Sequence, residues 1–424
     1  MNLKMYLSAL LLIAVAATIP TTADAQPVKK HMGAPAATLT FPQGKNVVEI
    51  PFEFERDKII IPVSVAGSEP LPFILDTGAP IAVLMDEDLA STLDLKITGK
   101  ARVGGAGEGE TKEVPIASDV TFDVAGIGIT GAMMAIGIGK DHFSNMRFAG
   151  VIGRPIFKNL VVDFDFENQI LRLYPPDKFS YSGSGEELPI TIEHGSFPYI
   201  NTEVSIDGGD PIETSLVIDT GAGHALSLSV EEHDGLEIPE KTVSSILGWG
   251  ANGVIRGRKG RISSLKIGDY LLQDVITSFP DQGGMHALKQ NGPHGQITRH
   301  GILGAKVLKR FRVVFDYTNE RVIFEPNGSL HDPFRSNTIG LMPKPWGAGA
   351  ESMEVAFVID SSPAQLAGIE VGDHITAING TPVAEMEVND IIGLIEQDPG
   401  SEMTLTVRRG NDKYQKKLTL KELI

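Results

Sequence analysis

The chain has 424 residues, of which 42% are hydrophobic and 21% are charged, so it is long enough for about two or three globular domains. Its formal net charge of -17 repels phosphate backbones and anionic lipid headgroups, which excludes nucleic acid as a partner. The absence of cysteine excludes disulfides, a thiol nucleophile and a lipidated cysteine.

Residues 1–25 have the layout of a cleavable signal peptide. The three parts are Lys4, an apolar run from about Leu7 to Ile19, and Ala23-Asp24-Ala25. The apolar run is shorter than the roughly 20 residues of a membrane anchor, so we expect cleavage. We therefore predict an exported protein, periplasmic or secreted in a bacterium, with no membrane span after signal removal. Residues 26–55 are predicted to be an N-terminal segment.

An Asp-Thr-Gly motif occurs twice with matching flanks. The first copy, "FILDTGAPIAVL", contains Asp76, and the second, "SLVIDTGAGHALSL", contains Asp219. An alternating strand and a glycine turn precede each copy, which predicts a β-hairpin. Downstream, "GVIGRPIFKNLVVDFD" matches "GILGAKVLKRFRVVFD". The repeat predicts two related β-rich lobes, residues 56–185 and 186–335.

A glycine cluster follows the Asp-Thr-Gly motif in each copy. The clusters contain Gly104, Gly105 and Gly107 in the first copy and Gly248, Trp249 and Gly250 in the second. Glycines between strand-like segments are typical of a mobile hairpin tip. For Trp249 two interpretations stay open: the ring covers bound substrate, or it packs on its own lobe.

Two buried aspartates that meet between the lobes cannot both ionise cheaply, so they must share a proton. Neither has a Lys or Arg within several residues, so no local ion pair is expected. The ionised member can activate water while the protonated member donates to a carbonyl, which hydrolyses a peptide bond without metal or cofactor. We expect Thr77 and Thr220 to bond across the two turns. Gly78 and Gly221 would allow close backbone approach and donate N–H groups.

These motifs resemble tandem retropepsin-like domains of the pepsin and retroviral aspartic protease superfamily. The resemblance covers residues from about 56 to 335 and includes Val151-Ile152-Gly153 and Ile302-Leu303-Gly304. It implies Asp76 and Asp219 as the catalytic dyad, and the two glycine-rich hairpins as flaps over an extended peptide. The fold class that it implies is mainly β, with two pseudo-twofold β-barrel lobes.

The chain departs from the family pattern directly after each Asp-Thr-Gly-Ala. Family members commonly have Ser or Thr there, whose hydroxyl bonds the dyad, whereas this chain has Pro80 and Gly223. Losing hydrogen bonds to the ionised form should raise the apparent pKa values of the pair. We therefore expect a pH optimum closer to neutral than that of pepsin.

The histidines predict no metal site. His286, His294 and His300 lie in a Gly- and Gln-rich stretch, residues 280–300, that reads as a loop, and their spacing fits no recognised metal motif. His224 could tune the dyad, but a strand histidine that faces elsewhere is the favoured interpretation.

Residues 337–424 form a different, compact module. Ser362-Pro363-Ala364 predicts a helix start and Ala367-Gly368 its end, and "EVNDIIGLIEQ" predicts an amphipathic helix. The stretch "SSPAQLAGIEVGDHITAINGTPV" resembles PDZ domains of bacterial proteases, an α/β-sandwich fold that binds peptide C-termini by strand addition. The resemblance implies a carboxylate-binding loop at Gly340, Leu341 and Met342.

Two prolines weaken the prediction that the groove binds a peptide. Pro343 and Pro345 remove two N–H donors from one side of its strand. The module therefore either binds ligands or only orients the protease lobes.

The sequence thus predicts an exported aspartic endopeptidase that acts on polypeptides, with protein C-termini as possible ligands of the PDZ-like module. The alternative is a non-catalytic protein that holds peptides in the interlobe cleft and the PDZ groove.

Overall fold

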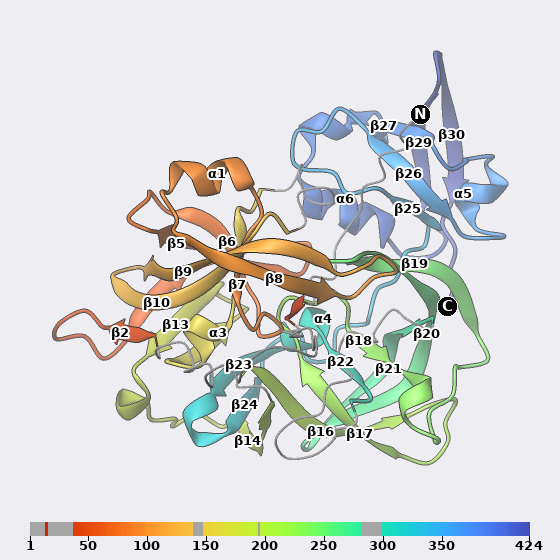
Figure 1. The fold of residues 1–424 in the computed structure, drawn as a ribbon. Helices are drawn as coiled ribbons and strands as arrows, with labels where there is room; N and C mark the ends of the chain where they lie inside the picture. The colour runs from red at the N-terminus through yellow and green to blue at the C-terminus, as the bar shows by residue number, and fades with distance from the viewer. Residues whose placement is uncertain (1–12, 16–36, 139–146, 194–195, 282–298) are drawn as a thin grey trace, which may run out of the picture.

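A computed structural model describes residues 13–15, 37–138, 147–193, 196–281 and 299–424. Most of the predicted signal peptide and most of the predicted 280–300 loop, including His286 and His294, lie outside the described residues. The described chain is mainly β, with two barrel-like sheets, a sheet shared between them and a C-terminal α/β module (Figure 1). The predicted fold class is confirmed.

The first lobe is built on a ten-stranded sheet in the order β1-β8-β9-β10-β7-β11-β6-β5-β4, with β2 on β10. An additional pairing of β5 with β9 curls this sheet on itself. The elements are β1 (Ile13–Val15), β2 (Thr38–Thr40), β4 (Glu53–Glu55), β5 (Lys58–Val65), β6 (Leu71–Leu75), β7 (Ala82–Leu84), α1 (Glu87–Thr92), β8 (Ile97–Gly105), β9 (Lys112–Val124), β10 (Ile127–Ile136), β11 (Gly150–Ile152) and α3 (Arg154–Phe157).

The second lobe repeats this plan in an eight-stranded sheet with the order β15-β16-β17-β22-β18-β21-β20-β19. Here the extra pairing joins β16 to β20. The elements are β15 (Thr191–Glu193), β16 (Phe197–Ser205), β17 (Ile212–Ile218), β18 (Leu226–Leu228), β19 (Thr242–Gly250), β20 (Gly253–Ile267), β21 (Tyr270–Pro280), β22 (Gly301–Leu303) and α4 (Ala305–Leu308).

Strands from both copies of the repeat form one six-stranded sheet in the order β14-β24-β23-β12-β13-β3. At its centre Asp163 of β12 faces Val314 of β23, its counterpart in the repeat, so a pseudo-twofold axis passes through this pair. The strands are β3 (Val48–Pro51), β12 (Val161–Asp165), β13 (Ile170–Tyr174), β14 (Glu186–Pro189), β23 (Phe311–Asp316) and β24 (Arg321–Pro326).

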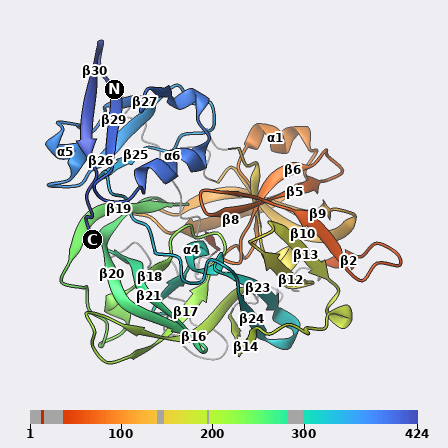
Figure 2. The same ribbon diagram turned by 180° about the vertical axis from the view of Figure 1, so that it is seen from behind.

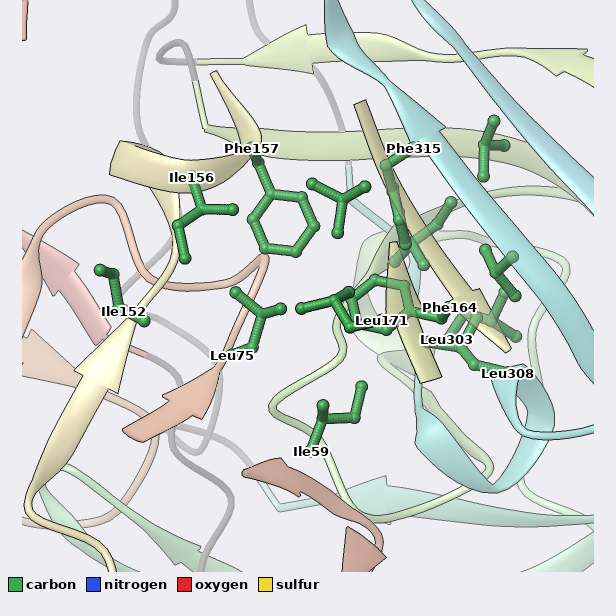
Figure 3. Close-up of a cluster of buried hydrophobic side chains, with 14 of the residues drawn as sticks. Ile59, Leu75, Ile152, Ile156, Phe157, Phe164, Leu171, Leu303, Leu308 and Phe315 are labelled. Carbon is green, nitrogen blue, oxygen red and sulfur yellow. The ribbon is translucent and has the colours of Figure 1, made fainter. Parts of the chain in front are cut away.

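A single hydrophobic core runs through both lobes and this shared sheet. Figure 3 shows apolar side chains of the two copies converging, among them Leu75, which immediately precedes the first Asp-Thr-Gly loop, and Leu303 at the end of β22. Phe157 of α3 and Phe315 of β23 meet edge to face, with ring centroids 5.5 Å apart. The two lobes therefore share buried apolar surface, which holds the two Asp-Thr-Gly loops in one rigid frame.

The C-terminal module has its own core and a sheet in the order β25-β26-β27-β29-β30, with β28 on β27 (Figure 2). Ser362 caps α5 by accepting a hydrogen bond from the Gln365 N–H, as the sequence predicts. The elements are β25 (Leu341–Pro343), β26 (Met353–Val358), α5 (Pro363–Leu366), β27 (His374–Ile378), β28 (Thr381–Pro382), α6 (Val388–Ile395), β29 (Glu402–Arg409) and β30 (Asp412–Thr419).

None of the helices in the described ranges combines the length and the apolar character that a membrane crossing requires.

Candidate active site

Asp76 and Asp219 lie together at the interface of the lobes, and both are fully buried. Each begins the loop that follows a central strand, β6 or β17, so the two loops approach each other around the pseudo-twofold axis. Within each loop the carboxyl Oδ1 accepts a hydrogen bond from the following glycine, Gly78 at 2.7 Å and Gly221 at 2.8 Å. The other oxygens, Asp76 Oδ2 and Asp219 Oδ2, are buried and have no hydrogen-bond partner within the described residues. Two buried carboxyls this close cannot both ionise cheaply, so a shared proton is expected.

The two threonines lock the loops together by reciprocal bonds. Thr77 N–H donates to Thr220 Oγ1 and Thr220 N–H donates to Thr77 Oγ1, each at 3.0 Å. Each hydroxyl in turn donates to the strand before the opposite aspartate: Thr77 to Ile218 O at 2.7 Å and Thr220 to Leu75 O at 2.9 Å. Four buried hydrogen bonds thus fix the relative position of the carboxyls.

Short parallel strands support the loops from behind. β11 lies beside β6 and β22 beside β17, so that Asp76 N–H donates to Ile152 O and Asp219 N–H to Leu303 O, both at 2.9 Å. A side chain at Gly153 would collide with the carbonyl oxygen of Asp76, because its Cβ would lie 2.0 Å away. The Val-Ile-Gly and Ile-Leu-Gly motifs therefore pack where the resemblance implies.

The two loops lie so close together that only glycine fits at positions 78 and 221. A Cβ on Gly221 would lie 2.3 Å from the carboxyl carbon of Asp76, and one on Gly78 would lie 3.0 Å from Asp219 Oδ2. Any side chain at these positions would push the carboxyls apart. The close approach of the dyad thus depends on both glycines.

The surroundings of the dyad affect the pKa values of the two carboxyls differently. Burial, then the negative charge of Asp219, raise the pKa of Asp76 well above its usual range. Burial also raises the pKa of Asp219, but the positive charge of Lys58 opposes the rise. Lys58 therefore favours the ionised form of Asp219.

No residue near either motif in sequence predicts Lys58 at the dyad, because it comes from a strand that starts 18 residues before Asp76. Lys58 begins β5, is only 6% exposed, and its ammonium donates to the Gly221 carbonyl oxygen in the other lobe. Burial lowers its pKa, whereas the charges of Asp219 and Asp76 raise it. A lysine at the head of the apolar strand "KIIIPVSV" was the only available signal.

The predicted flap residues lie at the tips of two hairpins that meet. Gly104 and Gly105 end β8, Gly248 and Gly250 lie in β19, and Gly107 has φ +125° in the first tip. The tips bond to each other: Gly109 N–H donates to Asn252 O at 2.7 Å, and Asn252 N–H donates to Ala106 O at 3.1 Å.

Close contact between the tips requires glycine. A Cβ on Gly107 would lie 2.7 Å from the backbone of Asn252 and Gly253, and one on Gly250 would lie 1.9 Å from Ala106 O. The two hairpins thus close against each other through backbone atoms.

Trp249 packs on its own lobe, which is one of the two interpretations of its role, and on the C-terminal module as well. Its side chain is fully buried, and it packs with Ile246 and Val254 against Ala356 and Phe357 of β26 in the C-terminal module. The ring therefore joins the second hairpin to that module and does not cover a substrate.

The C-terminal module docks on the turn between β4 and β5. Arg56 lies over the ring of Trp346, 4.0 Å from its centroid, and donates to the Trp346 carbonyl oxygen. Asn389 of α6 accepts from Arg56 N–H at 3.1 Å and donates to Phe54 O at 2.9 Å. Lys306 of α4 pairs with Glu396 at 2.7 Å.

A cavity of about 210 Å³ lies between the module and both lobes. Its walls come from three parts of the chain: Lys58 and Ile60 of the first lobe; Gly223, His224 and Lys259 of the second; and Met342, Pro343, Ile392 and Ile395 of the module. Burial and the charge of Lys58 lower the pKa of His224 to about 3. The expected peptide groove between β25 and α6 therefore opens toward Lys58.

The predicted carboxylate loop, Gly340, Leu341 and Met342, is already engaged by a side chain of its own module. Asn337 Oδ1 accepts from Gly340 N–H at 2.7 Å, and its Nδ2 donates to Leu341 O at 2.7 Å. β25 is an edge strand, so these are groups that an added peptide strand would use. A C-terminal ligand would have to displace Asn337.

No cluster of three or more His, Cys, Asp or Glu side chains that could hold a metal occurs in the part of the chain that the structure describes. His300, which the sequence placed in a loop, accepts a hydrogen bond from Ser215 N–H at 2.9 Å and contacts His233 edge to face.

In comparisons with known proteins, the same family model matches once in each lobe. The aspartyl protease family model matches residues 61–155 and again 202–307, and a PDZ domain model matches residues 354–409. No curated protein matches the chain. Among solved structures, the aspartic proteinase from Irpex lacteus aligns at 14% identity and a TM-score of 0.41, over 66% of this chain and 98% of that one. The predicted resemblance to the retropepsin-like aspartic proteases of the pepsin superfamily, with two tandem lobes and a C-terminal PDZ domain, is confirmed.

Proposed function

We propose that this protein is an exported aspartic endopeptidase that hydrolyses peptide bonds with a water activated by Asp76 and Asp219. One observation carries the proposal: two fully buried carboxyls lie close together, with unpartnered oxygens, in loops tied together by reciprocal threonine bonds. A structural role alone would not repay the cost of burying two acids without a neutralising ion pair for each.

The location of the shared proton determines which aspartate acts as the base and which as the acid. Asp219 takes a proton from water as the water oxygen attacks the scissile carbonyl carbon, and Asp76 donates its proton to the carbonyl oxygen. In the resulting gem-diol, Asp219 gives its proton to the amide nitrogen while Asp76 takes one from a hydroxyl. The C–N bond then breaks, and the dyad returns to its one-proton state without a cofactor.

The substrate class follows from the closed hairpins. The tips of β8–β9 and β19–β20 bond to each other through backbone atoms, so together they would cover an extended polypeptide and keep bulk water from the dyad. The hairpins must separate for a chain to enter. We propose unfolded or loosely folded polypeptides as substrates.

The PDZ domain would position those substrates. Its groove and the Lys58 side of the protease lobes line one cavity, which supports a path for a bound chain between them. Protein C-termini would bind at Gly340, Leu341 and Met342 after Asn337 has moved. Export of the protein rests on the signal-peptide pattern of residues 1–25.

The test is cleavage of an unfolded protein or a broad peptide library by the purified protein from about pH 3 to 8. Asp76→Asn and Asp219→Asn should each lower kcat by about 10³-fold or more, because each removes one of the two proton-transfer groups. Asp210→Asn, which removes a carboxylate from an exposed turn, is the matched control and should retain full activity.

Retention of cleavage in either dyad variant would contradict the proposed chemistry. A protein that binds the peptides at every pH, cleaves none, and keeps its affinity in both asparagine variants would instead be the non-catalytic peptide-binding protein.

A further inference from the structure

Lys58 reaches the dyad from one side only. It follows the tight β4–β5 turn, where Arg56 and Asp57 have φ of 54° and 56°, and its side chain crosses from the first lobe to the second catalytic loop. The β-hairpin register places Ile60 opposite Ile74 and Tyr199 opposite Val217. By that register the counterpart of Lys58 in the second lobe is Phe197, so the first catalytic loop has no equivalent cation.

Residue 223 is a glycine that lies directly beside this lysine. A Cβ at Gly223 would lie 3.4 Å from Lys58 Nζ and 3.0 Å from the Arg56 carbonyl oxygen. A serine or threonine, common in the family at this position, would have to share that space with the ammonium group. The missing hydroxyl and the buried lysine therefore belong to one arrangement.

The charges around the dyad balance only when Lys58 is counted. A dyad with one proton carries one negative charge in a buried site, where an uncompensated charge is costly. Lys58 supplies the opposite charge and acts on Asp219 more strongly than on Asp76. Four other titratable or charged groups face this cluster. Asp57 lies beside Lys58, and Arg299 lies near Asp219. The pKa of His224 is lowered to about 3, whereas burial and the charges of the dyad raise the pKa of Tyr317.

We propose that Lys58 is a positioning residue for the reaction: it holds the negative charge on Asp219 and the proton on Asp76, in place of the hydroxyl that Gly223 lacks. The proposal rests on the proposed peptidase function and assigns unequal roles to the two aspartates. It also explains how one loop works without the usual hydroxyl.

The test compares pH–rate profiles of wild type, Lys58→Gln and Lys58→Arg with that of Lys309→Gln. Lys309 is a matched control because it is a lysine close to the same turn, pairs with Asp57 at 2.9 Å, directly follows α4 and is more exposed than Lys58. Without Lys58 the one-proton dyad loses its counter-charge, so both limbs of the profile should move to higher pH by about one unit. Lys58→Arg should stay within a few tenths of wild type. Unmoved limbs in Lys58→Gln, with only kcat reduced, would overturn the proposal.

A second measurement needs no catalysis and separates this proposal from the proposed function. Urea midpoints at pH 6 are compared for Lys58→Gln in the wild-type and Asp219→Asn backgrounds. Lys58→Gln should lower the midpoint in wild type and lower it much less beside Asp219→Asn, because the lysine then has no charge to balance. An equal loss in both backgrounds would make Lys58 a packing residue and overturn the proposal, whether or not the protein cleaves peptides.

Discussion

At the scale of single residues, the site combines groups that are costly to bury with partners that reduce the cost. Asp76 and Asp219 share a proton, Lys58 balances the remaining charge, and Tyr317 stays neutral because burial and the dyad raise its pKa. His224 has no such compensation in acid. Burial and the charge of Lys58 lower its pKa to about 3, so it must stay neutral in the folded protein.

This histidine predicts an acid sensitivity with a defined direction. Between its ordinary pKa of about 6.5 and its folded value of about 3, the unfolded state binds a proton that the folded state does not. Its contribution to the free energy of unfolding is therefore intact above pH 6.5 and falls by at most about 1.4 kcal/mol for each pH unit below that. His224→Gln should flatten this slope in urea titrations from pH 7 to 4. His331→Gln, on an exposed loop, should not, and equal slopes in all three proteins would refute the prediction.

At the scale of elements, the two hairpins β8–β9 and β19–β20 differ in their surroundings although their sequences are related. Both tips close through backbone contacts that only glycine permits. The second hairpin is also joined to the PDZ domain, because Trp249 packs against β26. Figure 1 shows β19 running directly below the PDZ domain, whereas the first hairpin carries no contact of this kind in the described core clusters.

Closure of the hairpins can be tested with one methyl group. Gly250→Ala places its Cβ 1.9 Å from the Ala106 carbonyl oxygen in the closed arrangement, so the tips could not meet. We expect kcat/KM for a long peptide to fall about 10- to 100-fold, because the substrate would be poorly held and the site less well sealed. Gly99→Ala in β8, which has no atom within 4 Å of its new Cβ, is the matched control. Equal activity of the two variants would show that this closure plays no part in turnover.

At the scale of the whole molecule, the two lobes form one cooperative unit and the PDZ domain a second. The lobes share the six-stranded sheet and one hydrophobic core, whereas the PDZ domain has a core of its own. Each unit contains an ion pair between a partly exposed arginine and a buried carboxylate. Arg312 of β23 donates to Asp163 of β12 at 2.8 Å across the lobe boundary, and Arg409 of β29 donates to the buried Asp373 at 2.6 Å within the PDZ domain.

Removing these arginines should destabilise different parts of the chain. Arg312→Met leaves the Asp163 carboxylate buried with weaker compensation and should cost the protease lobes about 1–3 kcal/mol, a range that allows for the partial exposure of the arginine. Arg409→Met should lower the unfolding temperature of the PDZ domain and leave that of the lobes unchanged. Calorimetry on the two variants is the measurement, and a single transition shifted alike by both substitutions would contradict the division into two units.

Local patterns were enough to predict much of this molecule. The repeated Asp-Thr-Gly motif, the hairpins before it, the Gly153 and Gly304 motifs and the Ser362 helix cap all depend on residues close together in sequence. Strand alternation and turn chemistry act over a few residues, so they can be read without a structure. The duplication itself predicted that two equivalent loops would face each other.

Only the tertiary structure decided which distant groups meet at these motifs. Lys58 reaches a loop 163 residues away, and Trp249 packs on the PDZ domain as well as on its own hairpin. Neither of these contacts leaves a periodic or local signature, because a side chain's partner across a domain boundary depends on how whole sheets pack. The sequence determined that two aspartates would form a pair. The packing of three domains determined which charged side chain lies beside the pair, which hairpins cover it and how a substrate would reach it.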